Sequence, residues 1–295
     1  MARRILLVTH ANRPDLPALA AAVAAQLRDQ GIEVVELEQG WDSLEGDLEV
    51  AEAAAGAELV VVLGGDGTIL RGAEVSRGAG LPLLGINLGR VGFLAEAERE
   101  ETSEVVERIV ARDYTVEERM TLEVDVYQDG RLVDHTWALN EASVEKSARE
   151  RMLELTVEID GRPLSTWGCD GVVVATPTGS TAYAFSGGGP IVWPDVQALL
   201  VVPISAHALF ARPVVLGPDT RVAVEVVPHA TTQGVMWCDG RRTVDLPPGA
   251  RIEVRRSETP VRLARLSTGS FTDRLVAKFE LPVAGWRGKP DGSPA

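Results

Sequence analysis

The sequence predicts two domains of different class, a parallel α/β domain followed by an antiparallel β domain. The chain has 295 residues, and at about 100–200 residues per domain this length favours two domains. Apolar runs alternate with helical patterns through the first part of the chain, which is typical of a parallel sheet covered on both faces. Short strands separated by turn sequences then replace the helices, as in antiparallel β domains.

These changes of pattern define the expected domain boundaries. The α/β domain is expected over residues 1–115 and the β domain over residues 116–268. The segment 269–286 carries a last helical pattern, at 271–279, and is expected to pack back on the first domain. The tail 287–295 is rich in Gly, Pro and Lys and is predicted to be disordered.

Strands of the first domain are predicted from continuous apolar runs, because a strand of a covered parallel sheet is buried on both faces. These runs are 5–9, 32–37, 59–63 and 81–86. Helices are predicted where apolar residues recur at helical spacing. The helical segments are 16–30, 69–77 and 102–112. Gly31 follows the first of them and is a natural helix stop.

Strands of the second domain are predicted from short runs bounded by turn residues. Asp129-Gly130 lies between two such runs and is a hairpin signal, and Asp160-Gly161-Arg162-Pro163 separates two more. The predicted strands are 122–128, 132–138, 153–159, 164–167, 222–227, 235–238 and 252–256.

Composition excludes several classes of function. Lys plus Arg number 29 and Asp plus Glu number 43, so the formal net charge is −14. A surface of this sign repels phosphate backbones, which argues against nucleic-acid binding. No run of about 18 apolar residues occurs, so no membrane span is predicted. The two cysteines, Cys169 and Cys238, are too few for a disulfide framework or a zinc site, and we expect a cytoplasmic protein with reduced thiols.

The first chemical motif, Gly64-Gly65-Asp66-Gly67-Thr68, follows the apolar run 59–63. Ligands of open α/β sheets lie outside the carboxyl ends of the strands. Glycines there let backbone N–H groups approach phosphate oxygens at the start of the next helix. A carboxylate repels phosphate, so Asp66 is interpreted as a base or a metal anchor. The alternative is a tight turn in which Asp66 only caps the helix, and Thr68 either caps it or binds phosphate.

Two further motifs carry polar groups. Residues 176–183 read Thr-Pro-Thr-Gly-Ser-Thr-Ala-Tyr and follow a buried run. Their hydroxyls offer donors to phosphate and ribose, and Tyr183 offers a ring on which a base can stack. Leu139-Asn140-Glu141 lies at the end of a strand, where Asn140 can donate to ribose hydroxyls and Glu141 can accept from them. The alternatives are a solvated turn for the first motif and a surface loop for the second.

Together, and in this order, the motifs resemble those of the NAD kinase family. The shared segments are 64–68, 140–141, 170–183, Ser186 and 188–190, and Asp239-Gly240 is similar to a late motif of the family. The resemblance runs from about residue 5 to residue 286 and looks closest to actinobacterial members. It implies a Rossmann-like α/β domain followed by an antiparallel β-sandwich.

The resemblance also implies an activity. This is transfer of the γ-phosphate of ATP to the 2′-hydroxyl of the adenosine ribose of NAD, giving NADP and ADP. Some members also accept inorganic polyphosphate. A divalent cation, with Mg²⁺ as the expected ion, would arrive with ATP. The family forms homodimers and homotetramers, in which a neighbouring subunit helps to hold NAD.

By the same resemblance Asp66 is the expected catalytic base. The expected phosphate-binding residues are Gly64, Gly65, Gly67 and Thr68. The expected substrate-binding residues are Asp66, Gly67, Arg71, Asn140, Glu141, Arg151, Asp170, Thr181, Ala182, Tyr183, Ala184, Phe185, Ser186 and Ser205. No fixed metal site is expected.

Two other functions stay open on the residues alone. One is a lipid or sugar kinase that shares the Gly-Gly-Asp-Gly loop, although the chain lacks the exposed basic amphipathic segment that a lipid surface would favour. The other is a dinucleotide sensor without catalysis, which the presence of Asp66 beside the glycines disfavours.

Overall fold

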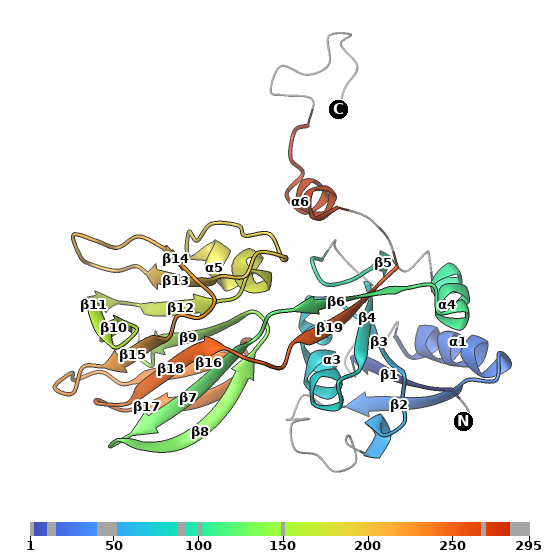
Figure 1. The fold of residues 1–295 in the computed structure, drawn as a ribbon, viewed down its shortest axis with the longest axis horizontal. Coiled ribbons are helices and arrows are strands. Elements are labelled where there is room, and N and C mark those ends of the chain that lie inside the picture. Colours follow the sequence, from blue (N-terminus) through green and yellow to red (C-terminus); the bar gives the residue numbers. More distant parts are fainter. Residues whose placement is uncertain are drawn as a thin grey trace, which may run out of the picture. The chain divides into compact units, whose positions relative to one another are not determined.

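The computed structural model describes residues 3–10, 16–39, 52–87, 92–98, 102–148, 151–266 and 270–283. The chain divides into two compact units (Figure 1). The first unit is formed by Met1–Glu117 together with Arg262–Ala295, and the second unit by Glu118–Val261. The predicted disordered tail 287–295 lies outside the described residues.

The first unit is an α/β unit built on a largely parallel sheet, as predicted. Its strands are β1 (Arg4–His10), β2 (Glu33–Gln39), β3 (Leu59–Leu63), β4 (Pro82–Asn87), β5 (Ala97–Glu98), β6 (Thr115–Arg119) and β19 (Val261–Arg265). Its helices are α1 (Leu16–Asp29), α3 (Asp66–Ala79), α4 (Thr102–Ala111) and α6 (Phe271–Phe279). The strand order is β2-β1-β3-β4-β19-β6, with β5 paired to β4. None of the helices described is long and apolar enough to cross a membrane.

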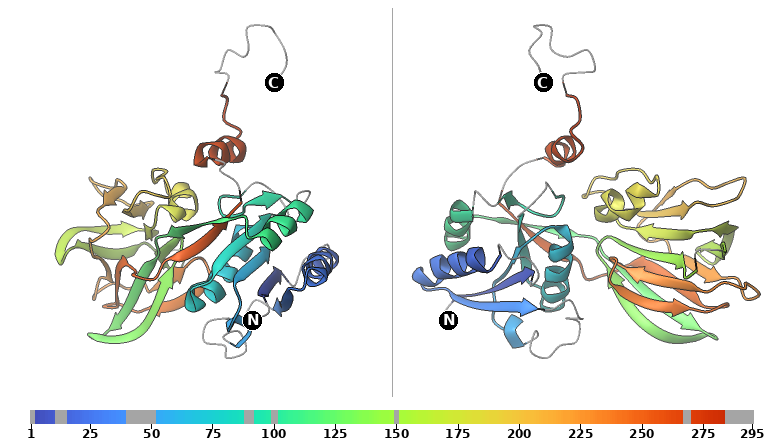
Figure 2. Two further views of the ribbon diagram at one scale, coloured as in Figure 1. Left: turned by 45° about the vertical axis from the view of Figure 1, so that its right-hand side comes forward. Right: turned by 180° about the vertical axis from the view of Figure 1, so that it is seen from behind.

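Helices cover both faces of this sheet (Figure 2). Apolar residues of α1 and α4 share one cluster with Leu7 and Val61 on one face. On the other face α3 lies against β3, so closely that a Cβ on Gly72 would be 2.4 Å from Val62 Cγ2. Successive side chains of a strand point to opposite faces, and β3 is therefore buried along its whole length.

The second unit is a sandwich of two antiparallel sheets. The strand orders are β11-β10-β15-β18-β7-β8 and β14-β13-β12-β9-β16-β17. The strands of the first of these sheets are β7 (Leu122–Gln128), β8 (Arg131–Ala138), β10 (Leu153–Ile159), β11 (Arg162–Cys169), β15 (Val222–Val226) and β18 (Arg251–Arg256). Those of the second are β9 (Glu141–Lys146), β12 (Gly171–Ala175), β13 (Leu199–Ile204), β14 (Val214–Leu216), β16 (Gly234–Cys238) and β17 (Arg242–Leu246). A short 3₁₀ turn, η2 (Thr178–Thr181), and the one-turn helix α5 (Tyr183–Ser186) follow β12.

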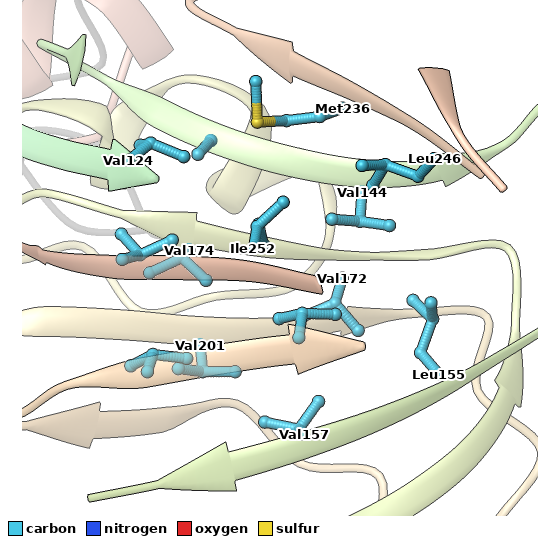
Figure 3. Packing of buried hydrophobic residues seen from close by; sticks show 14 of the residues in the cluster. Val124, Val144, Leu155, Val157, Val172, Val174, Val201, Met236, Leu246 and Ile252 are labelled. Carbon is cyan, nitrogen blue, oxygen red and sulfur yellow. The ribbon is translucent and has the colours of Figure 1, made fainter. Parts of the chain in front are cut away.

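One core fills the space between the two sheets (Figure 3). Val124 and Leu155 from one sheet belong to the same buried cluster as Val172 and Met236 from the other. Alternate residues of each strand therefore face this core, which is why the short strands alternate in the sequence. The predicted hairpins at Asp129-Gly130 and Asp160-Gly161 are present, with positive φ at all four residues, as tight two-residue hairpin turns require.

Two details differ from the sequence-based expectation. The strand β19 pairs in parallel with β4 in the sheet of the first unit, so the second unit ends at Val261 and not at residue 268. The helix α3 begins at Asp66, three residues before the predicted start, because Gly67 and Thr68 already have helical conformation although their side chains do not continue the apolar pattern.

Candidate active site

Asp66 lies where β3 ends and α3 begins. Gly65 is the N-cap residue of α3 and no side chain caps the helix. The carboxylate of Asp66 instead accepts hydrogen bonds from the backbone N–H groups of Phe93 and Leu94, at 3.1 and 3.2 Å. The interpretation that Asp66 only caps its own helix is therefore wrong. An ionised carboxylate has about four acceptor positions, so these two bonds leave room for a ligand hydroxyl.

Some residues around Asp66 have free space beside them, and others are packed closely against their neighbours. A Cβ on Gly65 or Gly67 would have no neighbouring atom within 4 Å, so a phosphate can approach the backbone N–H groups at this helix start. A Cβ on Gly64 would lie 2.5 Å from Thr68 Oγ1, and Thr68 is buried against this backbone. Arg71, an expected substrate-binding residue, is only 5% exposed, so little of its side chain is open to a ligand.

In the second unit, Asn140 and Glu141 lie where β8 gives way to β9. Both are only 8% exposed, so the surface-loop alternative is wrong. The buried carboxylate of Asp239 accepts hydrogen bonds from the backbone N–H groups of Leu139 at 2.9 Å and Asn140 at 2.7 Å. Arg242 donates to the same carboxylate at 3.0 Å. Asp239 thus holds the backbone of this turn, a role that sequence reasoning missed because its partners are about one hundred residues away.

The loop that follows β12 packs onto the same turn. The Thr176 hydroxyl donates to the Leu139 carbonyl at 2.6 Å, and the Ser180 hydroxyl bonds within its own loop. Both residues are fully buried, so the solvated-turn alternative is wrong and these two hydroxyls are not ligand donors. A Cβ on Gly179 would lie 2.0 Å from the Asn140 carbonyl oxygen, so only glycine permits this approach.

A cavity of about 550 Å³ opens beside this turn. Its lining residues are Glu141, Ser143, Glu145, Lys146, Ser147, Tyr183, Val235, Trp237 and Gly240. Tyr183 and Trp237 supply aromatic rings to it. The Oε2 atom of Glu141 is buried and has no hydrogen-bond partner among the described residues. Because a buried polar atom without a partner costs stability, this oxygen marks a position where a ligand group would be bound favourably.

Glu141 differs in protonation from an ordinary glutamate. Burial, together with the nearby Asp239 and Glu145 carboxylates, raises the pKa of Glu141 to about 8, and a hydrogen bond from the Tyr183 backbone opposes this rise. Burial also raises the pKa of Asp239, but Arg242 and three backbone N–H groups oppose this rise. Glu141 is thus the member of the pair that carries the proton near neutral pH. It can donate a hydrogen bond to a ligand, whereas the sequence suggested only an acceptor.

Asp170 and Ser205 come together, although they are far apart in the sequence. Lys146 Nζ lies 2.5 Å from Asp170 Oδ1. Hydrogen bonds from Lys146 and from the Ser205 side chain hold the pKa of Asp170 below its ordinary value. Ser205 has φ of +49°, an uncommon conformation for a residue other than glycine. Lys146 connects this pair to the cavity, which it also lines.

The other predicted substrate residues are distributed around α5. Thr181, Ala182 and Tyr183 are partly exposed, and Phe185 and Ser186 are exposed. Ala184 is fully buried in a cluster with Val173 and Leu200, so a ligand could reach only its backbone. Arg151 is exposed and donates to Thr231 at 3.1 Å, and the structure does not bring it to the cavity.

One group of side chains in the described part of the chain has the spacing of metal ligands. It consists of Glu123, Asp125 and His135. The Arg255 guanidinium donates to Glu123 at 2.8 Å and to Asp125 at 2.6 Å. Although burial raises the pKa of Asp125, hydrogen bonds from His135 and Arg255 keep it below its ordinary value. The Arg255 guanidinium already binds both carboxylates, and a cation placed among them would lie against this positive charge, so the cluster fits a metal ion poorly.

Comparisons with known proteins identify the family. The ATP-NAD kinase N-terminal domain matches residues 5–114, and the ATP-NAD kinase C-terminal domain matches residues 139–266. The chain is 59% identical to NAD kinase 2 of Streptomyces coelicolor, over 98% of each chain. It is 60% identical to the NAD kinase of Thermobifida fusca, over 97% of this chain and 92% of that protein. A crystal structure of an NAD kinase from Archaeoglobus fulgidus in complex with ATP superimposes with a TM-score of 0.72 and 26% identity, over 94% of this chain and 98% of that one. This chain therefore belongs to the NAD kinase family.

Proposed function

We propose that this chain is an ATP-dependent NAD kinase, which transfers the γ-phosphoryl group of ATP to the 2′-hydroxyl of the adenosine ribose of NAD. The products are NADP and ADP. The observation that carries the proposal is the Asp66 carboxylate, held by two backbone N–H groups beside open glycines, in a chain of this family.

Asp66 is the proposed general base. Its two hydrogen bonds orient the carboxylate, and its remaining acceptor positions can bind the 2′-hydroxyl and take its proton as the new O–P bond forms. The backbone N–H groups at Gly65 and Gly67 are the proposed phosphate donors, because they lie at the start of α3 and no atom lies within 4 Å of the place that a Cβ on either glycine would take. This assignment needs no fixed metal ligand from the chain.

The cavity of the second unit is the proposed site for the nucleoside part of the substrate. Tyr183 can stack on a base, and the protonated carboxyl of Glu141 can donate to a ribose hydroxyl or another acceptor. The cavity volume of about 550 Å³ is within the usual range for small-molecule sites. Asn140 adds a second polar side chain at the same turn.

ATP is the proposed phosphoryl donor, supported by the ATP complex of the Archaeoglobus fulgidus relative. A divalent cation, with Mg²⁺ as the expected ion, would be carried by the ATP phosphates and would neutralise charge on the transferred group. The use of polyphosphate, the cytoplasmic location and assembly into homodimers or homotetramers stay predictions. An assay with polyphosphate in place of ATP tests the use of polyphosphate, and light scattering tests the assembly.

The test is formation of NADP from NAD, ATP and Mg²⁺ by the purified chain. Diacylglycerol and sugar phosphates serve as competing acceptors. Asp66→Asn should lower kcat by about 10²–10⁴ while calorimetry still detects NAD binding. Asp113→Asn, which alters an exposed ion pair with Arg108, is the control and should leave turnover unchanged. Phosphorylation of another acceptor in place of NAD would exclude the proposed function, and so would NAD binding without NADP formation.

A further inference from the structure

The orientation of the Asp66 carboxylate depends on a segment outside its own loop. This is the Phe93–Glu96 segment, which supplies the two N–H donors at Phe93 and Leu94. The residue just before this segment is also packed closely on the carboxylate, because a Cβ on Gly92 would be only 2.4 Å from Asp66 Oδ1. Whatever holds this segment therefore holds the carboxylate.

The C-terminal helix α6 holds the segment through Arg274. The guanidinium donates from Nη1 to the Ala95 carbonyl at 2.5 Å and to the Phe93 carbonyl at 3.4 Å. Its Nη2 donates to the Glu96 carboxylate at 2.5 Å. These bonds satisfy carbonyl groups of the same short stretch whose N–H groups point at Asp66.

Two further contacts fix the segment from other directions. The Phe93 ring lies 5.8 Å from the Phe271 ring and 6.1 Å from the Phe279 ring, both on α6. The Glu96 side chain is only 1% exposed and also pairs with Arg265. A buried carboxylate needs such partners, so Glu96 joins β19 and α6 to one point of the chain.

We propose that α6 is a positioning element for phosphoryl transfer, in which Arg274 acts through the Phe93–Glu96 segment to hold the Asp66 carboxylate in its reactive orientation. The inference rests on the proposed function of Asp66 as the base. Arg274 is a positioning residue, since its partners are two backbone carbonyls and Glu96. The helix has nine residues and a capping box at Ser270 and Asp273. A helix this short is marginal in isolation, so its docking on the segment is also what keeps it formed.

The first test compares three variants of the full-length chain. Arg274→Ala should lower kcat by about 10- to 100-fold, because a displacement of about 1 Å costs this much in a positioned group. The KM for NAD should change by less than about threefold, since the lost interaction serves the transition state. Arg274→Lys keeps the charge and should recover part of kcat. Arg108→Ala, which removes the exposed ion pair with Asp113, is the matched control and should retain wild-type kcat.

A double variant separates positioning from general damage to the fold. In an Asp66→Asn background, Arg274→Ala should cause little further loss of activity, because both changes remove the same base. Additive losses, or a wild-type kcat in Arg274→Ala, would overturn the proposal.

Hydrogen exchange gives a readout that does not need activity. The amides of Phe93 and Leu94 should exchange faster in Arg274→Ala, while the midpoint of thermal unfolding stays close to that of Arg108→Ala. If hydrogen exchange of these amides were unchanged in Arg274→Ala, the inference would be contradicted, even if this variant were inactive. Absence of NADP formation by the wild-type chain would instead count against the proposed function alone.

Discussion

At the scale of the residue, the unusual feature is a pair of buried carboxyl groups beside the cavity. Asp239 has three backbone donors and Arg242, whose guanidinium also lies 4.5 Å from the Trp137 ring centre. Glu141 has an oxygen without a partner among the described residues. This asymmetry assigns the charge to Asp239 and the proton to Glu141, and a neutral acid at this position recognises hydrogen-bond acceptors of a ligand.

This protonation predicts a pH dependence of stability. The pKa of Glu141 rises from 4.5 to about 8 on folding, so between these values the folded state holds a proton that the unfolded state releases. The free energy of unfolding therefore falls as pH rises through this window, and the loss is complete above about pH 8. Glu141→Gln mimics the protonated form and should equal wild type in stability near pH 4.5 and exceed it increasingly up to about pH 8.

Thermal unfolding of both proteins across this pH range is the measurement. Glu154→Gln, a change at an exposed glutamate of β10, is the control and should show no such trend. A stability difference between Glu141→Gln and wild type that does not vary with pH would contradict the assignment of the proton to Glu141.

At the scale of the element, the start of α3 combines an anion-binding helix end with a carboxylate. Asp66 belongs to the first turn of the helix, yet its carboxylate faces the Phe93–Glu96 segment and not the helix N–H groups. The Asp66 carboxylate therefore does not occupy the N–H groups at Gly65 and Gly67. The proposed base and the proposed phosphate site can thus lie next to each other, because their hydrogen bonds run in different directions.

Two glycines of α3 allow a matched test of this phosphate site. A Cβ on Gly67 or on Gly78 would meet no atom within 4 Å, so Gly67→Ala and Gly78→Ala should both fold. Alanine is favoured over glycine in helices by about 1 kcal/mol, so neither should lose stability. Gly67→Ala should lower kcat/KM for ATP by about 10²-fold, because its methyl group blocks the donors, and Gly78→Ala should not. Equal kinetics of the two variants would remove Gly67 from the phosphate site.

At the scale of the whole molecule, each unit brings distant parts of the chain together. The sheet of the first unit includes β19 from the C-terminal part, and α6 reaches the segment that holds Asp66. In the second unit, the turn at Asn140 is held by Asp239, about one hundred residues later. Because the Glu123 and Asp125 carboxylates both pair with Arg255, we expect the fold to need no metal ion at this group.

Metal removal should therefore affect catalysis and not folding. Treatment with EDTA should abolish NADP formation, and excess Mg²⁺ should restore it, because the cation acts on the phosphates of ATP. The midpoint of thermal unfolding without nucleotide should be the same with and without EDTA. A lower midpoint in EDTA would show that the chain binds a structural cation of its own.

Local physics explains which elements could be predicted from the sequence. The bounds of β3 were predicted because a strand buried on both faces must be apolar at every position. The hairpin at Asp129-Gly130 was predicted because these residue types tolerate positive φ. The strand β19 could not be assigned to its sheet in this way, since Val261–Arg265 contains two arginines and is not the continuous apolar run of a covered parallel strand. Only its pairing with β4 assigns it to the first unit.

Patterning, turn chemistry and motifs are properties of short stretches, and they were enough to predict the two fold classes, the family and the kinds of groups at the site. How these groups are held and charged depends on contacts that form only in the folded chain. Burial turns Thr176 and Ser180 into loop supports, directs the Asp66 carboxylate to Phe93 and Leu94, and leaves the proton on Glu141. Desolvation and contacts between distant residues arise only when the chain is folded, so no local pattern encodes them.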